Sequence, residues 1–161
     1  MGNAYVWEQQ HERAIAEGER AITLDPNDAD GYSWLGVTLI FAGRPEEALR
    51  LIEKAMRLNP YYPVDYLFHL GWAYRVAGRC EEALAPFKKV LTLNPNFTPA
   101  HINLAACYAE LSRLEEARAE AAEVQRLAPN LSIEGMGPRL PYKDPADLER
   151  FLAALRKAGL K

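Results

Sequence analysis

Three pairs of adjacent glutamates are the residues of this chain whose type and spacing first suggest chemistry. They are Glu46-Glu47, Glu81-Glu82 and Glu115-Glu116. Paired carboxylates can act as general acid and general base. These pairs, however, recur at intervals of 35 and 34 residues, each at the start of a helical pattern, where the unpaired backbone N–H groups favour negative charge. We therefore interpret them as helix starts and not as an acid–base site.

The histidines and cysteines do not form a recognisable site either. His11, His69 and His101 are far apart, and none has a Cys, Asp or Ser at a spacing typical of catalysis. Cys80 and Cys107 are too few for a disulfide framework or a metal site. No phosphate loop, zinc-protease pattern or nucleophile elbow occurs. We expect no catalytic residue, no metal and no cofactor, and predict that the chain is not an enzyme.

Composition narrows the class of partner. The chain has 161 residues, of which 49% are apolar and 25% charged, and its net charge is −3. Its basic residues are spread out, whereas nucleic-acid and membrane-surface binding both use clustered Lys and Arg. No apolar run approaches the roughly 20 residues that span a bilayer, and the N-terminus lacks the order of a signal peptide. We expect a cytoplasmic protein without nucleic-acid or membrane partners.

The elements that would position these residues follow a period. Residues 29–60 contain two helical apolar patterns separated by a turn with Gly43 and Pro45. Pro60 is followed by Pro95 after 35 residues and by Pro129 after a further 34. A period of this size predicts a stacked array of helix pairs.

The residues at fixed places in this period resemble the tetratricopeptide repeat. The order Leu35-Gly36, Gly43, Ala48, Ala55, Pro60 returns twice, as Leu70-Gly71, Tyr74, Gly78, Ala83, Phe87, Val90, Pro95 and as Leu104-Ala105, Tyr108, Ser112, Ala117, Ala121, Val124, Pro129. Leu39 replaces the usual Tyr, Ala105 and Ser112 replace glycines, and one residue is inserted at 61–63. The resemblance implies an all-α fold, a right-handed α-solenoid of tetratricopeptide helix hairpins.

We divide the chain, as one solenoid domain, at the ends of the repeats. The parts are an N-terminal partial repeat with one main helix (1–28), three repeats (29–62, 63–97 and 98–131), a connector (132–143) and a C-terminal capping helix (144–161). Tyr5, Val6 and Trp7 would be the remnant of a missing first helix, which leaves an apolar face open at the N-terminus. Asp144 and Pro145 are suited to begin the capping helix, which would close the last face of the array.

The C-terminal sequence shows a second resemblance. Residues 140–160, LPYKDPADLERFLAALRKAGL, resemble the extreme C-terminus of bacterial proteins in which a class III adenylate or guanylate cyclase domain precedes tetratricopeptide repeats. This resemblance implies that the chain is the regulatory or docking arm of a bacterial signalling protein.

Candidate binding residues follow from the tetratricopeptide resemblance, because in that family the first helix of each pair lines a concave groove that holds partner peptides or helices. The groove-facing positions are Ser33, Trp34, Val37, Ile40 and Phe41 in the first repeat, Phe68, His69, Trp72, Arg75 and Val76 in the second, and Ile102, Asn103, Ala106 and Glu110 in the third.

Trp34 and Trp72 are the preferred anchors, because Trp often dominates interfaces. The alternative is that both are core residues between repeats. Asn103 matches a place where family members hold a peptide backbone. Arg75 alone corresponds to the basic clamp for acidic chaperone tails, so that a chaperone-tail adaptor is not expected.

The sequence therefore predicts an interaction module that binds a protein or peptide in its groove. The alternative is a scaffold that self-associates as a homodimer through the open N-terminal face.

Overall fold

The described chain is helical throughout. A computed structural model describes residues 10–161, in which no strand occurs. The helices are α2 (His11–Leu24), α3 (Ala29–Phe41), α4 (Pro45–Leu58), α5 (Val64–Val76), α6 (Cys80–Leu93), α7 (Thr98–Glu110), α8 (Leu114–Leu127), α9 (Ile133–Met136) and α10 (Pro145–Lys157), with a 3-10 turn η1 (Gly137–Arg139). The predicted helical remnant at Tyr5, Val6 and Trp7 lies outside the described residues.

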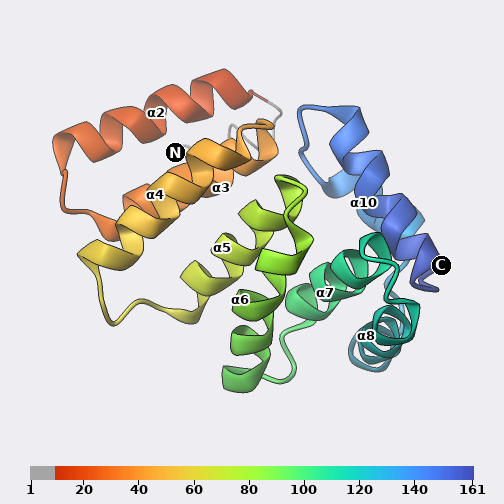
Figure 1. The fold of residues 1–161 in the computed structure, drawn as a ribbon. Coiled ribbons are helices and arrows are strands. Elements are labelled where there is room, and N and C mark those ends of the chain that lie inside the picture. Colours follow the sequence, from red (N-terminus) through yellow and green to blue (C-terminus); the bar gives the residue numbers. More distant parts are fainter. Residues whose placement is uncertain (1–9) are drawn as a thin grey trace.

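Consecutive helices form hairpins that stack along the chain (Figure 1). α3 packs against α4, α5 against α6 and α7 against α8, and each hairpin packs on the next through α4·α5 and α6·α7. The first helices α3, α5 and α7 also contact one another in order. The predicted α-solenoid of helical hairpins is therefore confirmed.

Small residues at fixed repeat positions set the geometry of each hairpin. A Cβ on Gly71 would lie 2.8 Å from the ring of Phe87, so that α5 and α6 can approach this closely only with glycine at that position. Gly78, in the turn of the same repeat, has φ +76°. In the third repeat Ser112 occupies the equivalent position with φ +61°, a left-handed conformation that is unfavourable for a residue with a side chain.

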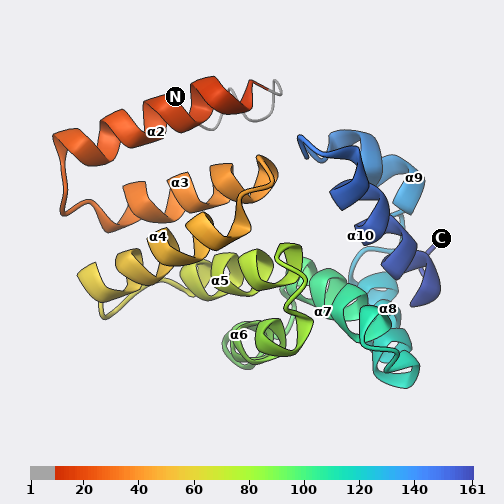
Figure 2. The same ribbon diagram turned by 45° about the horizontal axis from the view of Figure 1, so that its top comes forward.

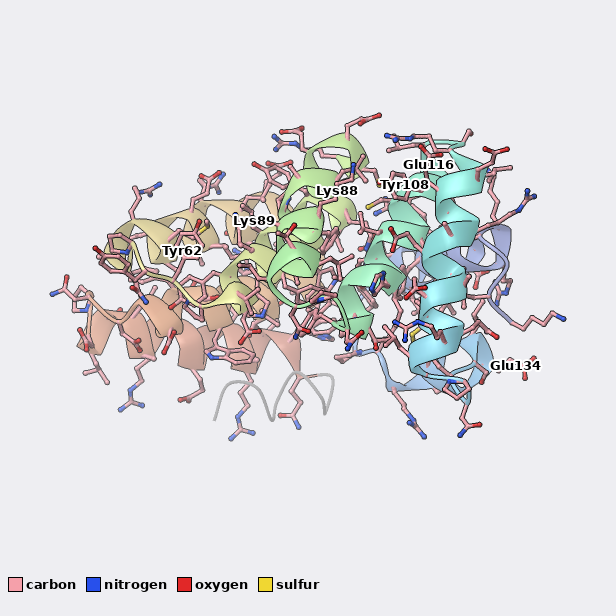
Figure 3. The ribbon with its side chains drawn as sticks, turned by 90° about the horizontal axis from the view of Figure 1, so that it is seen from below. Tyr62, Lys88, Lys89, Tyr108, Glu116 and Glu134 are labelled. Atoms are coloured by element: carbon pink, nitrogen blue, oxygen red, sulfur yellow. The ribbon has the colours of Figure 1, made fainter. Side chains whose placement is uncertain are left out.

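The paired glutamates have the structural role that their period suggests. The second member of each pair forms an ion pair with the arginine that precedes its helix, at 2.6 Å in the first two repeats and 2.8 Å in the third: Arg44–Glu47, Arg79–Glu82 and Arg113–Glu116. The arginine hydrogen bond lowers the pKa of each of these carboxyls. Figure 3 shows Glu116 on α8 and Lys88 and Lys89 on α6, and all three side chains are exposed.

The N-terminal helix covers its neighbour with its apolar side and presents a polar side outward. Ala14 and Ile15 of α2 are buried against α3. Glu12, Glu19 and Arg20 are exposed. α3 already covers the apolar side of α2. Within the described residues, the side of α2 that faces away from α3 is therefore mostly polar, whereas the sequence predicted an open apolar face at the N-terminus.

The C-terminal region, residues 132–161, turns back into the bend formed by α3, α5 and α7 (Figure 2). α10 packs chiefly on α7, and Phe151 and Leu155 are buried in the cluster that holds the third repeat together. The backbone N–H of Ile133 donates to Lys161 O at 2.9 Å, which joins the two ends of the region. The helix that the sequence placed at the end of the array thus lies on its concave side.

Between η1 and α10 the chain crosses the concave side without regular structure; we call residues 140–144 the crossing segment. Its backbone is bound at the far end of the array. Lys143 N donates to Phe41 O at 2.8 Å, and His11 Nε2 donates to Pro141 O at 2.5 Å, since a carbonyl oxygen can only accept. The crossing segment therefore connects the third repeat with the first.

Candidate functional site

A cavity of about 480 Å³ lies on the concave side, between the first helices and the C-terminal region. Its volume is within the range of about 300–1,000 Å³ that is usual for ligand pockets. It is lined by residues from α3, α5 and α7 and from the C-terminal region: Trp34, Val37, Phe41, Phe68, His69, Trp72, Arg75, Pro99, Ile102, Asn103, Met136, Leu140, Tyr142 and Phe151.

Six of the fourteen lining residues are Phe, Trp or Tyr. The ring centroids of Phe41 and Trp72 are 4.8 Å apart, with an edge-to-face orientation, and Phe68 lies 5.8 Å from Trp72. The ring centroids of Trp34 and His69 are 5.6 Å apart, and Trp34 is 49% exposed. Because Trp34 is the most accessible of these rings, it marks the open side of the cavity.

Arg75 is the charged group in the wall, and it is only 1% exposed. Its Nε donates to Asn103 Oδ1 at 2.7 Å, and its Nη2 donates to Tyr142 Oη at 2.8 Å. The guanidinium also lies 4.0 Å from the centre of the Phe151 ring, a cation–π contact. Arg75 thus links α5 to α7 and to the crossing segment, and buried donors of this kind are costly to leave without partners.

His69 is a neutral member of the wall. Its Nδ1 forms a hydrogen bond with Ser33 Oγ at 2.8 Å, which joins α5 to α3. Burial lowers the pKa of His69 to about 4, and the negative charge of Asp65 opposes this effect only in part. The imidazole is therefore uncharged near pH 7, as an apolar pocket requires.

Nine of the fourteen residues that the sequence placed in the groove line this cavity. They are Trp34, Val37, Phe41, Phe68, His69, Trp72, Arg75, Ile102 and Asn103. Trp34 is exposed, whereas Trp72 is half-buried and donates its Nε1–H to Tyr142 Oη at 3.1 Å. Trp72 therefore belongs both to the pocket and to the packing between repeats.

The other five predicted groove residues lie elsewhere. Ser33, Ile40, Val76 and Ala106 are buried among the helices, where they contribute to packing. Glu110, at the end of α7, accepts a hydrogen bond from Cys80 Sγ at 3.4 Å and lies 3.9 Å from Arg150 Nε. The first helices α3, α5 and α7 pack against other helices on more than one side. The four buried side chains therefore face neighbouring helices and not the groove.

Asn103 matches a place where family members hold a peptide backbone, but in this structure its amide is bound within the chain. Its Nδ2 donates to Pro99 O at 2.8 Å while its Oδ1 accepts from Arg75. Both ends of the amide are therefore bound within the chain, and it orients Arg75.

Sequence reasoning missed the side of the pocket that comes from outside the predicted groove positions: Pro99, Met136, Leu140, Tyr142 and Phe151. Four of these belong to the C-terminal region, which the sequence divided into a connector and a cap. A signal was present, because residues 133–142 contain several large apolar side chains that a solvent-exposed connector does not need.

The two cysteines behave as small core residues. Both are buried and free of disulfides, and the hydrogen bond of the Cys107 thiol with Cys80, together with burial, raises the pKa of Cys107. A buried thiol with a raised pKa is chemically inert. Within residues 10–161, no cluster of His, Cys, Asp and Glu is placed to hold a metal ion. The helices of that part are also too short or too polar to cross a membrane.

Comparison with known proteins identifies the repeats. Three family models match successive and overlapping parts of the chain: a TPR repeat model at residues 2–40 and two tetratricopeptide repeat models at residues 27–96 and 76–133. Together they span residues 2–133, which is the array without its C-terminal region.

Solved structures share the fold over nearly the whole chain. TTC0263, a thermophilic TPR protein of Thermus thermophilus, is 25% identical with a TM-score of 0.70, over 98% of this chain and 86% of that one. YrrB, described as a TPR protein with an unusual peptide-binding site, is 27% identical with a TM-score of 0.63, over 98% and 80%.

A curated relative matches a shorter stretch. The small glutamine-rich tetratricopeptide repeat-containing protein 2 of Saccharomyces cerevisiae is 35% identical over 51 residues, which are 32% of this chain and 15% of the yeast protein. The repeat models, the stacked hairpins and the shared structures together show that the chain belongs to the tetratricopeptide repeat family.

Proposed function

We propose that this chain is a protein–protein interaction module that binds a short segment of a partner at the pocket on its concave side. The observation that carries the proposal is the apolar cavity beside the half-exposed Trp34. A large exposed aromatic at the edge of an apolar cavity is typical of residues that contribute most to binding energy.

Two further facts support a peptide partner. The tetratricopeptide fold is that of interaction modules, and the similar protein YrrB is described as having a peptide-binding site. The cavity is walled by the C-terminal region, so that it fits one or two large side chains and not a long helix. An extended peptide with a bulky apolar anchor is therefore the occupant we propose.

The test is a selection of peptides from a displayed random library, followed by titration calorimetry. We expect Trp34→Ala to weaken binding of the selected peptides about tenfold or more, because it removes the accessible wall of the pocket. Tyr61→Ala is the matched control, since Tyr61 is an aromatic that is 96% exposed and lies outside the pocket. Equal losses in the two variants, or selected peptides that are indifferent to both, would overturn the proposal.

The resemblance of residues 140–160 to cyclase-associated repeat proteins extends the proposal to a docking arm of a bacterial, cytoplasmic signalling protein. The arm would hold the partner while a cyclase domain in the same polypeptide carries out the chemistry. Sequencing the complete gene tests this extension, because a gene without a cyclase domain eliminates it.

Self-association as a homodimer is the second candidate, and it depends on the N-terminal helix. Leu24 at the end of α2 is 78% exposed, which favours a contact. Leu58 and Leu93 occupy the same place in their repeats and are also exposed, so that this exposure is a property of the period. Light scattering decides, since a monomer at high concentration eliminates the candidate.

A further inference from the structure

The crossing segment occupies the concave groove in the manner of a bound peptide. It has no helix or strand of its own, and its hydrogen bonds reach α2, α3 and α5. The carbonyl of Pro141 accepts from His11 Nε2, and the N–H of Lys143 donates to the carbonyl of Phe41 at the end of α3. Backbone bonds to a receptor are how extended peptides gain affinity without a fixed sequence.

Tyr142 is the anchor of this segment. Its side chain is 7% exposed, and its ring packs edge-on against Phe41 with centroids 5.2 Å apart. Its hydroxyl accepts from both Trp72 Nε1 and Arg75 Nη2. These are two groups that the sequence had singled out as binding residues, and in the structure their partner is the chain itself.

Lys143, which follows Tyr142, adds an ion pair with α2. Lys143 Nζ lies 2.5 Å from Glu12 Oε1 on α2. Both side chains are largely exposed, so that the pair contributes little energy, but it fixes the direction and register of the segment. The structure thus places an acidic residue of α2 beside the basic residue that follows the buried tyrosine.

The groove is nevertheless filled incompletely. The cavity of about 480 Å³ borders Leu140 and Tyr142 on the side of Trp34 and Phe68. A peptide that filled this cavity as well as the place of Tyr142 would bury more apolar surface than the crossing segment does. The cavity is thus a place where a competing peptide can begin to bind.

From these contacts we propose that residues 140–143 are an internal ligand of the groove, and that the partner is an extended peptide with a tyrosine followed by lysine or arginine, which displaces them. The proposal rests on the function proposed above and adds the chemistry of the partner and its regulation. A tethered segment competes at a high effective concentration, so that partner binding is weakened until the segment leaves.

The experiment uses the full chain and a synthetic peptide of residues 138–146, with the same peptide carrying Ala at the place of Tyr142 as control. Calorimetry compares the wild type with the double variant Tyr142→Ala/Lys143→Ala. We expect the double variant to bind the tyrosine peptide at least about tenfold more tightly than the wild type does, and to discriminate against the control peptide. Equal binding to both proteins, or no binding to the variant, overturns the proposal.

A second measurement avoids dependence on the variant. In the wild type, the amide of Lys143 donates to Phe41 O, and we expect this bond to protect it from hydrogen exchange. Saturation with the tyrosine peptide should accelerate exchange at this amide while α4 and α6 remain protected. Protection that persists while the peptide is bound overturns displacement.

Two outcomes distinguish the internal ligand from the proposed function alone and from self-association. Library peptides that need Trp34 but bind the wild type and the double variant equally would leave the proposed function standing and refute the internal ligand. A dimer in the wild type that is lost in the double variant would show that the segment binds a second copy, which also refutes it. Light scattering on both proteins detects the latter.

Discussion

The repeat array and the crossing segment are stabilised by different kinds of contact. The array repeats one apolar pattern, so that residues such as Phe87 and Ile52 are completely buried at equivalent places. The crossing segment buries only a few side chains, chiefly Pro141 and Tyr142, and is otherwise bound by polar contacts centred on Tyr142. The array should therefore unfold as a unit, whereas the crossing segment can leave it at a smaller cost in free energy, and this difference is what a regulated groove requires.

The largest effect is expected in the array. Phe87→Ala should lower the free energy of unfolding by about 3–5 kcal/mol, because it leaves a cavity between α5 and α6. Urea unfolding followed by circular dichroism measures it. Leu93→Ala, on the same helix but 59% exposed, is the control and should change stability only slightly. A Phe87 variant of near wild-type stability would contradict the account of the array.

The second effect is a dependence on pH that arises from His69. Its pKa is lowered to about 4 by burial, so that between pH 6.5 and 4 the unfolded chain binds a proton that the folded chain does not. The free energy of unfolding should therefore fall as the pH falls through this window, by about 2–3 kcal/mol at its lower end.

The variant His69→Gln should remove that part of the dependence. Urea unfolding at pH 7 and at pH 4.5 gives the loss of stability for each protein, and the difference between the two losses is the contribution of His69. Equal losses in wild type and variant would show that His69 titrates normally.

A smaller effect is expected in the crossing segment. Tyr142→Phe keeps the ring and removes the oxygen that accepts from Trp72 and Arg75, which leaves buried donors without a partner at a cost of about 1–3 kcal/mol. Hydrogen exchange should accelerate at Lys143 while the array keeps its protection.

Tyr61→Phe is the matched control for Tyr142→Phe, because its hydroxyl belongs to an exposed side chain. It should leave exchange unchanged throughout. If Tyr142→Phe accelerates exchange equally in α4 and α6, the crossing segment and the array are one cooperative unit, and the comparison fails.

The smallest effect compares two repeats of the array. Ser112 has φ +61° where Gly78 has φ +76°, so that Ser112→Gly should stabilise the chain by about 0.5–1 kcal/mol. Gly78→Ser is the reciprocal change and should destabilise by a similar amount, because a Cβ there meets no neighbour and only the backbone conformation matters. Thermal unfolding of both variants measures the pair, and changes of the same sign would contradict the prediction.

The sequence predicted the hairpins because each depends on local patterns. The prolines that end the second helices, Gly43 and Gly78 in the turns and the apolar spacing recur at one period, and each repeat contacts only its neighbours. The same locality explains why nine of the predicted groove residues lie together: a position on the first helix faces the same side in every repeat.

The crossing segment could not be predicted in this way. Its contacts join residues far apart in the chain, such as Lys143 with Phe41 and Tyr142 with Trp72, and no period relates them. The sequence by itself determined the repeats, their helices and the side from which a groove would be lined. Only the tertiary structure decided that α10 returns to the concave side and that Tyr142 binds Arg75, because the path of an aperiodic segment is set by the surface on which it packs.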